Sequence, residues 1–294
     1  MGQYRMAGTQ PVIYPSRLLQ GGVCAAAPAK INRFLHILGR QDDGYHLLET
    51  GFQFIQWCDW IHFRVSKTLG IRILDDPMHL GEKNLVYKAA ARVIDPKVHG
   101  IDIMIEKYLP VGGGLGGGSS DAATTLTVIN TLFGLGHSTD RLRDIGLTIG
   151  ADVPVFVLGE SCFASGIGEK LKTCIWPGTR VLIADPRIHV STREVFQHPK
   201  LTRDTPSSRI RASQLDTTTN DCEVVVREIH SEVEELINRM QIFGEPRLTG
   251  TGGCVFVVDP INTDSAEAAL RDIARVKVCL LSNDSMLYTF NAEV

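Results

Sequence analysis

The chain has 294 residues, which is enough for one large or two modest domains, and its hydrophobic share of 44% supports a sizeable core. A formal net charge of −3 argues against a nucleic-acid surface. The sequence contains no run of about 18 apolar residues, so it predicts no membrane span. The seven cysteines include no C-x-x-C pair, so we interpret them as reduced thiols of a cytoplasmic protein, not as a metal site or a disulfide framework.

The first half of the chain predicts strands and helices in separate clusters. Residues 1–22 contain proline and glycine without periodicity, and we expect a disordered extension that is not a signal peptide. Residues 23–73 have the alternation of strands. The pattern then predicts, in chain order, a helix over 84–94, a strand over 101–105, helices over 119–133 and 139–149, and strands over 162–165, 170–175 and 181–184.

The second half begins after a short break at Asp185-Pro186. It predicts helices near 192–197, 221–241 and 264–275, and strands near 246–249, 254–258 and 276–281. Because strands cluster apart from helices and do not alternate strictly with them, we predict an α+β fold. We divide it into domains at 23–185 and 186–294.

The most informative segment is rich in glycine. Six of the seven residues from Gly112 to Gly118 are glycines, and Ser119-Ser120-Asp121 then begins the predicted helix. A bare backbone that leads into a helix N-terminus is a site for phosphate. Ordering glycine costs roughly 1 kcal/mol per residue relative to alanine, which is expensive for a plain turn. The alternative is a flexible surface loop.

The loop does not by itself identify its phosphate. The pattern G-x-G-x-x-G occurs at Gly112, Gly114 and Gly117, but the acidic residue at the spacing of a dinucleotide site, Asp140, looks like part of a helix cap. A Walker loop needs lysine after the last glycine, where serine follows here. The landmarks of protein kinases are absent. The sequence therefore predicts a phosphate loop of another class.

Two charged residues have contexts that suggest chemistry. Lys30 lies among small and apolar residues in a strand pattern, and Asp152 lies in Gly-Ala-Asp-Val-Pro. Each has a structural alternative: Lys30 extends to solvent at a strand edge, and Asp152 caps a helix. If the fold brings them together beside a phosphate, the carboxylate can orient a hydroxyl and take its proton.

Three further segments are candidates for binding. Asp43-Gly44-Tyr45-His46 predicts a turn followed by an aromatic ring for stacking and an imidazole for reading a ring edge, or else polar decoration of a hairpin. The segment from Ser191 to Phe196 contains a capping box, which favours Phe196 as a core residue. The glycines at 250–253 are either a turn between strands or a second bare backbone near an anion.

Taken together, these segments resemble the GHMP small-molecule kinase superfamily. They lie at 27–32, 43–46, 110–123, 150–154 and 250–253, in the order of the family, within about residues 25 to 285. The segment at 43–46 separates one branch from mevalonate, homoserine and galactose kinases. That branch uses ATP to phosphorylate the 2-hydroxyl of 4-diphosphocytidyl-2-C-methyl-D-erythritol, a cytidine-diphosphate-linked methylerythritol, in the non-mevalonate isoprenoid pathway.

The resemblance implies a two-domain fold with the active site in the cleft between an N-terminal ATP-binding domain and a C-terminal substrate domain. It implies that Lys30 and Asp152 are catalytic and that the cofactors are ATP and Mg²⁺. The residues implied for ATP are Asn84, Pro110, Gly112, Gly113, Gly114, Leu115, Gly116, Gly117, Gly118, Ser119 and Ser120. Those implied for the substrate are Asn32, Tyr45, His46, Thr192, Phe196, Gly250, Thr251 and Gly252. The metal ligands and the oligomeric state are not assigned.

The chain departs from the family pattern at two positions. Asp121 stands where asparagine is frequent, and Gly253 stands where alanine is expected. An acid beside a phosphate loop repels phosphate unless a cation intervenes or the acid points away. Two other functions stay open on the sequence: another kinase of the superfamily, which would have no use for Tyr45, His46 and Phe196, and an inactive nucleotide sensor, which would not need Lys30 and Asp152.

Overall fold

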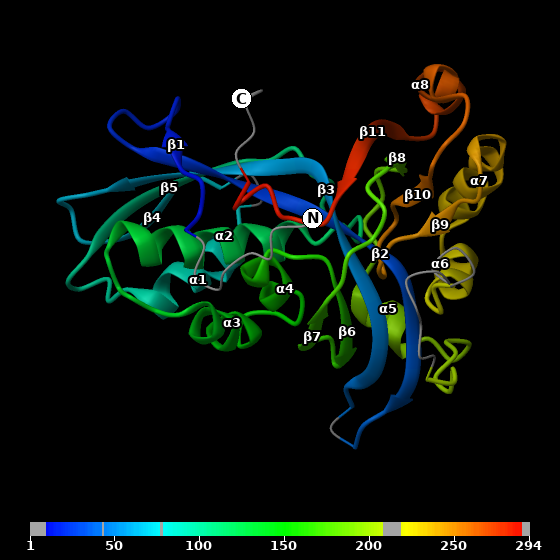
Figure 1. The fold of residues 1–294 in the computed structure, drawn as a ribbon, viewed down its shortest axis with the longest axis horizontal. Helices are drawn as coiled ribbons and strands as arrows, with labels where there is room; N and C mark the ends of the chain where they lie inside the picture. Colours follow the sequence, from blue (N-terminus) through cyan, green and yellow to red (C-terminus); the bar gives the residue numbers. More distant parts are fainter. Residues whose placement is uncertain (1–9, 43, 77–78, 208–218, 290–294) are drawn as a thin grey trace.

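The fold is a continuous, strongly bent sheet covered by two groups of helices (Figure 1). The computed structural model describes residues 10–42, 44–76, 79–207 and 219–289. The main path of the sheet runs β1-β2-β3-β11-β8-β10-β9. Its two halves are joined by β11, which pairs with β3 at one end and with β8 over the rest of its length. No helix of the described residues is long and apolar enough to cross a membrane.

The N-terminal half of the sheet is organised around two long antiparallel strands. Its strands are β1 (Tyr14–Pro15), β2 (Val23–Arg40), β3 (His46–Val65), β4 (Gly70–Asp75), β5 (Gly100–Glu106), β6 (Cys162–Gly166) and β7 (Lys170–Thr173). The register of β2 against β3 shifts between Pro28 and Lys30 and again between Asn32 and Phe34. Such irregularities bend a strand and re-aim its side chains, and here they bracket the two polar residues Lys30 and Asn32.

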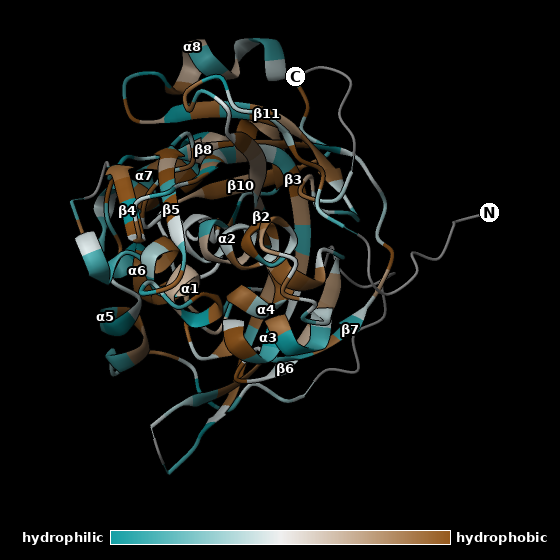
Figure 2. Ribbon diagram, turned by 90° about the vertical axis from the view of Figure 1, so that its left-hand side faces the viewer, coloured by the Kyte–Doolittle hydropathy of each residue, from teal (hydrophilic) through white to brown (hydrophobic). Residues whose placement is uncertain are grey.

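Helices cover one side of this half. They are α1 (Leu85–Val93), α2 (Gly117–Leu132), α3 (Thr139–Leu147) and α4 (Val153–Leu158), with a short 3-10 helix over Gly81–Lys83. Helix α2 is surrounded by other elements in the middle of the molecule (Figure 2). Its residues from Ser120 to Ile129 are buried, because the segment is made of alanine, threonine and aliphatic residues on every side. The start of α2 is therefore fixed in position.

The C-terminal half continues the sheet with β8 (Arg180–Asp185), β9 (Arg247–Leu248), β10 (Val255–Val258) and β11 (Arg275–Ser282). Its helices are α5 (Thr192–Gln197), α6 (Glu223–Ile229), α7 (Ser231–Met240) and α8 (Ala266–Leu270), with 3-10 helices over Gln241–Phe243 and Thr263–Ser265. Apolar residues of α6, α7, β8 and β10 form one core, and the start of the sheet with α1 and α2 forms another. This mixture of clustered strands and helices confirms the predicted α+β class.

Three details differ from the expected elements. The helix expected over 221–241 is divided into α6 and α7 at His230, whose backbone is extended. The one expected over 264–275 ends at Leu270. The extension expected to be disordered is ordered from residue 10 onward: β1 pairs with β2, and Leu19 is buried. Residues 1–9 lie outside the described residues. The division at residue 185 falls at the end of β8, and it stays a prediction.

Candidate active site

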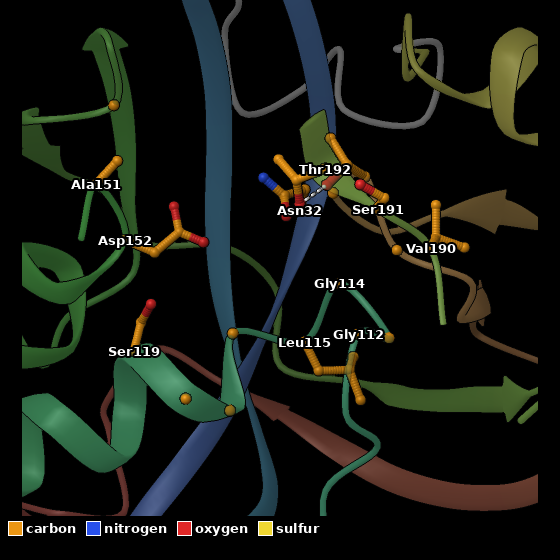
Figure 3. A pocket seen from close by; sticks show the side chains of 18 of the residues that line it. Asn32, Gly112, Gly114, Leu115, Ser119, Ala151, Asp152, Val190, Ser191 and Thr192 are labelled. Atoms are coloured by element: carbon orange, nitrogen blue, oxygen red, sulfur yellow. Dashed lines mark hydrogen bonds between the residues drawn. The ribbon is translucent and has the colours of Figure 1, made fainter. Parts of the chain in front are cut away.

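A cavity of about 860 Å³ lies between the two halves of the molecule. Every site residue predicted from the sequence lines it except Ser120. Figure 3 shows how they meet: Asn32 comes from β2, Gly112 to Leu115 from the glycine loop, Ser119 from the first turn of α2, Asp152 from the start of α4, and Thr192 from α5. Segments that are far apart in the sequence thus surround one space.

Lys30 and Asp152 face each other in this cavity. The Lys30 Nζ lies 3.4 Å from an Asp152 carboxylate oxygen, and it also donates to Asn32 Oδ1 at 2.5 Å and to the Gly114 carbonyl at 3.1 Å. The Lys30 side chain is 3% exposed, whereas that of Asp152 is 36% exposed and points into the cavity (Figure 3). Burial lowers the pKa of Lys30, and the carboxylate of Asp152 opposes this shift.

Asp152 does not act as a helix cap. It occupies the N-cap position of α4, but its backbone is helical and its side chain makes no capping hydrogen bond. Pro154 in the first turn lacks an N–H group in any case. The structural alternative for Asp152 is therefore wrong, since the carboxylate turns toward Lys30. The alternative for Lys30 is wrong as well, because its amine is buried beside Asn32 and Phe52 rather than extended to solvent.

The glycine loop has an unusual backbone. Gly112, Gly114 and Gly116 have φ angles of 74°, 79° and 76°, in the left-handed region that glycine adopts without strain. Gly117 then begins α2, so the loop ends at the positive end of the central helix. Gly118 is exposed to the cavity. These are the features of an anion site at a helix N-terminus.

The second glycine segment packs directly against this loop. A Cβ atom at Gly252 would lie 2.0 Å from the Gly114 nitrogen, and one at Gly114 would lie 2.0 Å from the Thr249 carbonyl oxygen. Thr249 Oγ1 donates to the Gly114 carbonyl at 3.2 Å and accepts from the Asn32 N–H at 3.0 Å. The segment is a turn between the antiparallel strands β9 and β10, as one interpretation predicted, and it also lies against the glycine loop. Its proximity to an anion stays a prediction.

A buried charge cluster supports the loop from behind. Lys107 Nζ donates to Asp121 at 2.9 Å and to Asp59 at 2.5 Å, and Asp59 also accepts the N–H groups of Tyr108 and Leu109. Burial lowers the pKa of Lys107, but the two carboxylates together raise it above its ordinary value. Lys107 thus lies beside Asp121, and burial raises the pKa of the Asp121 carboxyl, which reduces its negative charge. Both effects allow an acid next to the glycine loop.

Asn84 and the two serines differ in their positions. The Asn84 side chain caps α1 by accepting the Val86 N–H, and it lines the cavity. Ser119 lines the cavity, with its hydroxyl on the side of Asp152 (Figure 3). Ser120 is fully buried in α2, and its hydroxyl has no partner among the described residues. The one-residue step along a helix, about 100°, explains why neighbouring serines face different surroundings.

The other end of the cavity is aromatic. Tyr45 is 60% exposed, and His46 stacks on Phe196 with ring centroids 4.9 Å apart. Phe196 is partly buried: it packs against the C-terminal core and also lines the cavity. Its contact with the substrate stays a prediction. The hydroxyls of Thr192 and Thr251 form a hydrogen bond of 2.9 Å between the two ends of the cavity. Asp43, which belongs to the same sequence segment as Tyr45, lies outside the described residues.

Several residues at the site were not found from the sequence. Thr249 precedes the second glycine segment, so its proximity to that segment was the available signal. Lys107 and Asp59 carried no local signal, because their pairing depends on the approach of β3 and β5. Arg203, which donates to the His46 ring at 3.2 Å, lies between the helices predicted at 192–197 and 221–241, where the sequence predicts no element.

Comparison with known proteins agrees with this geometry. The GHMP kinases N terminal domain matches residues 84–160. The chain is 44% identical to a 4-diphosphocytidyl-2-C-methyl-D-erythritol kinase of Pseudomonas aeruginosa (strain UCBPP-PA14) over 267 residues, 89% of this chain and 95% of that protein. The chain belongs to the family of 4-diphosphocytidyl-2-C-methyl-D-erythritol kinases. A relative of the same name from Nitrosococcus oceani is 46% identical over 78% of this chain and 83% of that protein.

Solved structures place this kinase family within a wider fold. A crystal structure of 4-(cytidine 5'-diphospho)-2C-methyl-D-erythritol kinase is 30% identical, with a TM-score of 0.75 over 88% of this chain and 99% of that one. A homoserine kinase from Cytophaga hutchinsonii is 16% identical, with a TM-score of 0.61 over 90% and 95%. At that identity the second likeness concerns the fold alone. The fold of GHMP kinases is therefore confirmed for this chain.

The packing of the two glycine segments makes a prediction for Gly252→Ala. The added methyl group would meet the backbone of Gly113 and Gly114, which cannot move without opening the phosphate loop. We expect a loss of about 1–3 kcal/mol in the free energy of unfolding, and weaker ATP binding in the folded fraction. Urea unfolding and calorimetry measure the two effects. Gly39→Ala is the control, because nothing lies within 4 Å of its added carbon. Equal behaviour of the two variants would show that the contact is not tight.

The buried cluster makes a prediction about pH. Burial raises the pKa of Asp121 from 3.8 to about 7, although Lys107 opposes the shift. The folded state therefore holds a proton that the unfolded chain has released, and stability falls as pH rises from about 4 to 7. Asp121→Asn should be more stable than the unaltered protein at pH 8 by about 1–4 kcal/mol, and similar to it at pH 5. Urea unfolding at both pH values tests this, with the exposed Asp140→Asn as control. A pH-independent difference between the two proteins would contradict it.

Proposed function

We propose that this chain transfers the γ-phosphoryl group of ATP to the 2-hydroxyl of 4-diphosphocytidyl-2-C-methyl-D-erythritol, in the non-mevalonate pathway to isoprenoid precursors. The observation that carries the proposal is the pair Lys30–Asp152, 3.4 Å apart, beside a phosphate loop in one cavity. The cavity has two chemically different ends, one of bare backbone and one of aromatic rings. This fits a reaction between ATP and an alcohol that bears a nucleotide base.

The two catalytic groups have different tasks in this proposal. Asp152 is exposed enough to meet the substrate hydroxyl, which it orients and whose proton it takes as the new bond to phosphorus forms. Lys30 is buried and holds Asp152 in place. Its charge also stabilises the negative charge that develops on the transferred group. Asn32 positions the Lys30 amine by accepting from it, while its own amide donates to Thr50 at 2.8 Å.

The phosphates of ATP are proposed to lie on the glycine loop at the start of α2, and its adenine near Asn84. Mg²⁺ commonly binds one or two protein oxygens together with substrate phosphates and water. The Ser119 hydroxyl, at the cavity wall, is of the kind that such an ion takes (Figure 3). The ion would offset the negative charge concentrated on the phosphates during transfer.

The cytosine ring is proposed to lie at the aromatic end. Tyr45 is the exposed ring on which it would stack, and the edge of His46 would read its polar groups. Phe196 supports His46 from the other side. The halves before and after residue 185 would then serve mainly ATP and substrate, respectively. We place the reaction in the cytoplasm because all seven cysteines are free thiols, the usual state in a reducing compartment.

The role of Asp152 is tested by Asp152→Asn, which preserves shape and removes charge. We expect kcat to fall by about 100-fold or more, since proton transfer in the transition state is lost, while ATP binding changes little. A coupled assay of ADP release and calorimetry with ATP measure the two quantities. Asp140→Asn, at an 88% exposed position on α3, is the control. Near-normal turnover of Asp152→Asn would remove Asp152 from the chemistry.

The identity of the acceptor is tested by Tyr45→Ala. Loss of ring stacking weakens binding of the base by about 1–3 kcal/mol. The KM for the cytidylyl substrate should therefore rise roughly 5- to 150-fold, while the KM for ATP stays unchanged. Tyr108→Ala is a matched control, because Tyr108 is 45% exposed but not at the cavity. The same assay with mevalonate and homoserine as acceptors completes the test. Turnover of either in preference to the cytidylyl alcohol would reject the proposed substrate.

A further inference from the structure

Arg203 joins the two segments that form the aromatic end of the cavity. Its guanidinium donates to the His46 ring at 3.2 Å, to the carbonyls of Phe196 and His198 at 2.9 Å each, and to the Leu201 carbonyl at 3.0 Å. His46 begins β3, whereas Phe196 lies in α5. A single side chain therefore holds the imidazole and the end of the helix that carries the ring beneath it.

The contact with His46 determines where that ring carries its proton. The Arg203 Nε–H is the donor and His46 Nε2 the other partner. A guanidinium in a protein is always protonated and cannot accept a hydrogen bond, so Nε2 must be the acceptor. In a neutral imidazole the other nitrogen then bears the hydrogen. His46 thus presents an Nδ1–H donor.

Burial and two neighbouring cations disfavour the charged form of His46. Burial lowers the pKa of His46, and the nearby charges of Arg203 and Arg40 lower it further. The stacking of His46 on Phe196, with an interplanar angle of 28°, limits rotation of the imidazole. The position, rotation and tautomer of this ring are therefore constrained by its neighbours Arg203 and Phe196, while His46 itself lines the cavity.

A donor of fixed position distinguishes between pyrimidines. Cytosine offers acceptors at O2 and N3, whereas N3 of uracil carries a hydrogen. A donor aimed at N3 bonds to cytosine and meets another donor in uracil. A site built around one hydrogen bond rejects the analogue that leaves it unpaired more strongly than a merely apolar pocket does.

We propose that Arg203 is a positioning residue that sets the tautomer and orientation of His46 and thereby selects cytosine over uracil at the aromatic end of the cavity. The inference rests on the proposed function for the place of the base. Arg203 itself does not touch the base. It acts through the Nδ1–H group of His46.

The first test compares the 4-diphosphocytidyl substrate with its uridylyl analogue. Arg203→Met keeps the aliphatic stem and removes the donors. We expect the ratio of kcat/KM for the two substrates to fall by at least about tenfold, mainly through KM of the cytidylyl substrate, with KM for ATP unchanged. Arg203→Lys keeps the charge but loses the donor geometry, so the ratio should fall there too. Arg239→Met is the control, because Arg239 also binds a backbone carbonyl and a carboxylate, Ala269 and Asp272, but away from the cavity.

The second test measures the His46 ring directly. Nitrogen NMR of the unaltered protein should show a proton on Nδ1 and an unprotonated Nε2. In Arg203→Met the tautomers should mix and the pKa of His46 should rise, because a nearby cation is gone. In a His46→Phe background, Arg203→Met should cause no further change in selectivity. Additive losses in that double variant would mean that Arg203 does not act through His46.

Other outcomes separate this inference from the proposed function. If the unaltered protein phosphorylates neither substrate, the proposed function fails, and binding of CDP against UDP by calorimetry still tests the base preference. Equal affinity for CDP and UDP overturns the inference. So does a proton on Nε2 of His46 in the unaltered protein. A purely structural Arg203 would lower the melting temperature and reduce kcat/KM for both substrates equally, and this also overturns it. If Arg203→Met does not fold, the unaltered protein, Arg203→Lys and His46→Phe decide the question.

Discussion

The site depends on the contact between two stretches of backbone. At Gly114 and Gly252 the chain approaches so closely that a Cβ atom on either residue would fall within about 2 Å of a backbone atom of the other segment. This contact brings the turn after β9 to the loop before α2, and it places Thr249 between Gly114 and Asn32. Lys30 donates to the same Gly114 carbonyl. The glycine loop, the Lys30–Asp152 pair and the C-terminal half are thus held in one arrangement.

Buried charges are the second constraint, and each is satisfied in its own way. An unpaired ammonium in the interior would lose its charge, because desolvation disfavours the charged form. Lys30 retains partners in Asp152, Asn32 and the Gly114 carbonyl, whereas Lys107 lies between two carboxylates. The difference has a consequence for function. Both acidic partners of Lys107 are buried, so this cluster supports the glycine loop. Lys30 instead pairs with a carboxylate that is open to the cavity.

The two ends of the cavity obey different physical rules. At the glycine loop, recognition comes from backbone N–H groups and the end of a helix, so the absence of side chains is what matters. At the aromatic end, recognition comes from ring faces and one imidazole edge, so side-chain orientation is what matters. The hydroxyls of Thr192 and Thr251 meet between these ends and join α5 to the turn after β9. The proposed transfer takes place where the two kinds of surface meet.

The sequence by itself determined the parts whose physics is local. Six glycines before a helix predict a phosphate loop, because only glycine adopts the required backbone without strain. Alternation and helical spacing predicted most elements, and the family pattern identified Lys30, Asp152 and the cavity residues before their positions were known. The structure divides the helix predicted over 221–241 at His230. The prediction missed this break because one extended residue does not interrupt the periodic pattern of apolar residues.

Only the tertiary structure decided what depends on residues meeting from different segments. Asp152 had the same local signature as a helix cap, and its proximity to Lys30 is what removes that interpretation. The tolerance of Asp121 depends on Lys107, and the tautomer of His46 depends on Arg203, both from other segments of the chain. Such pairings carry no signal in spacing, because the distance between two side chains is set by how strands and loops pack and not by their separation along the chain.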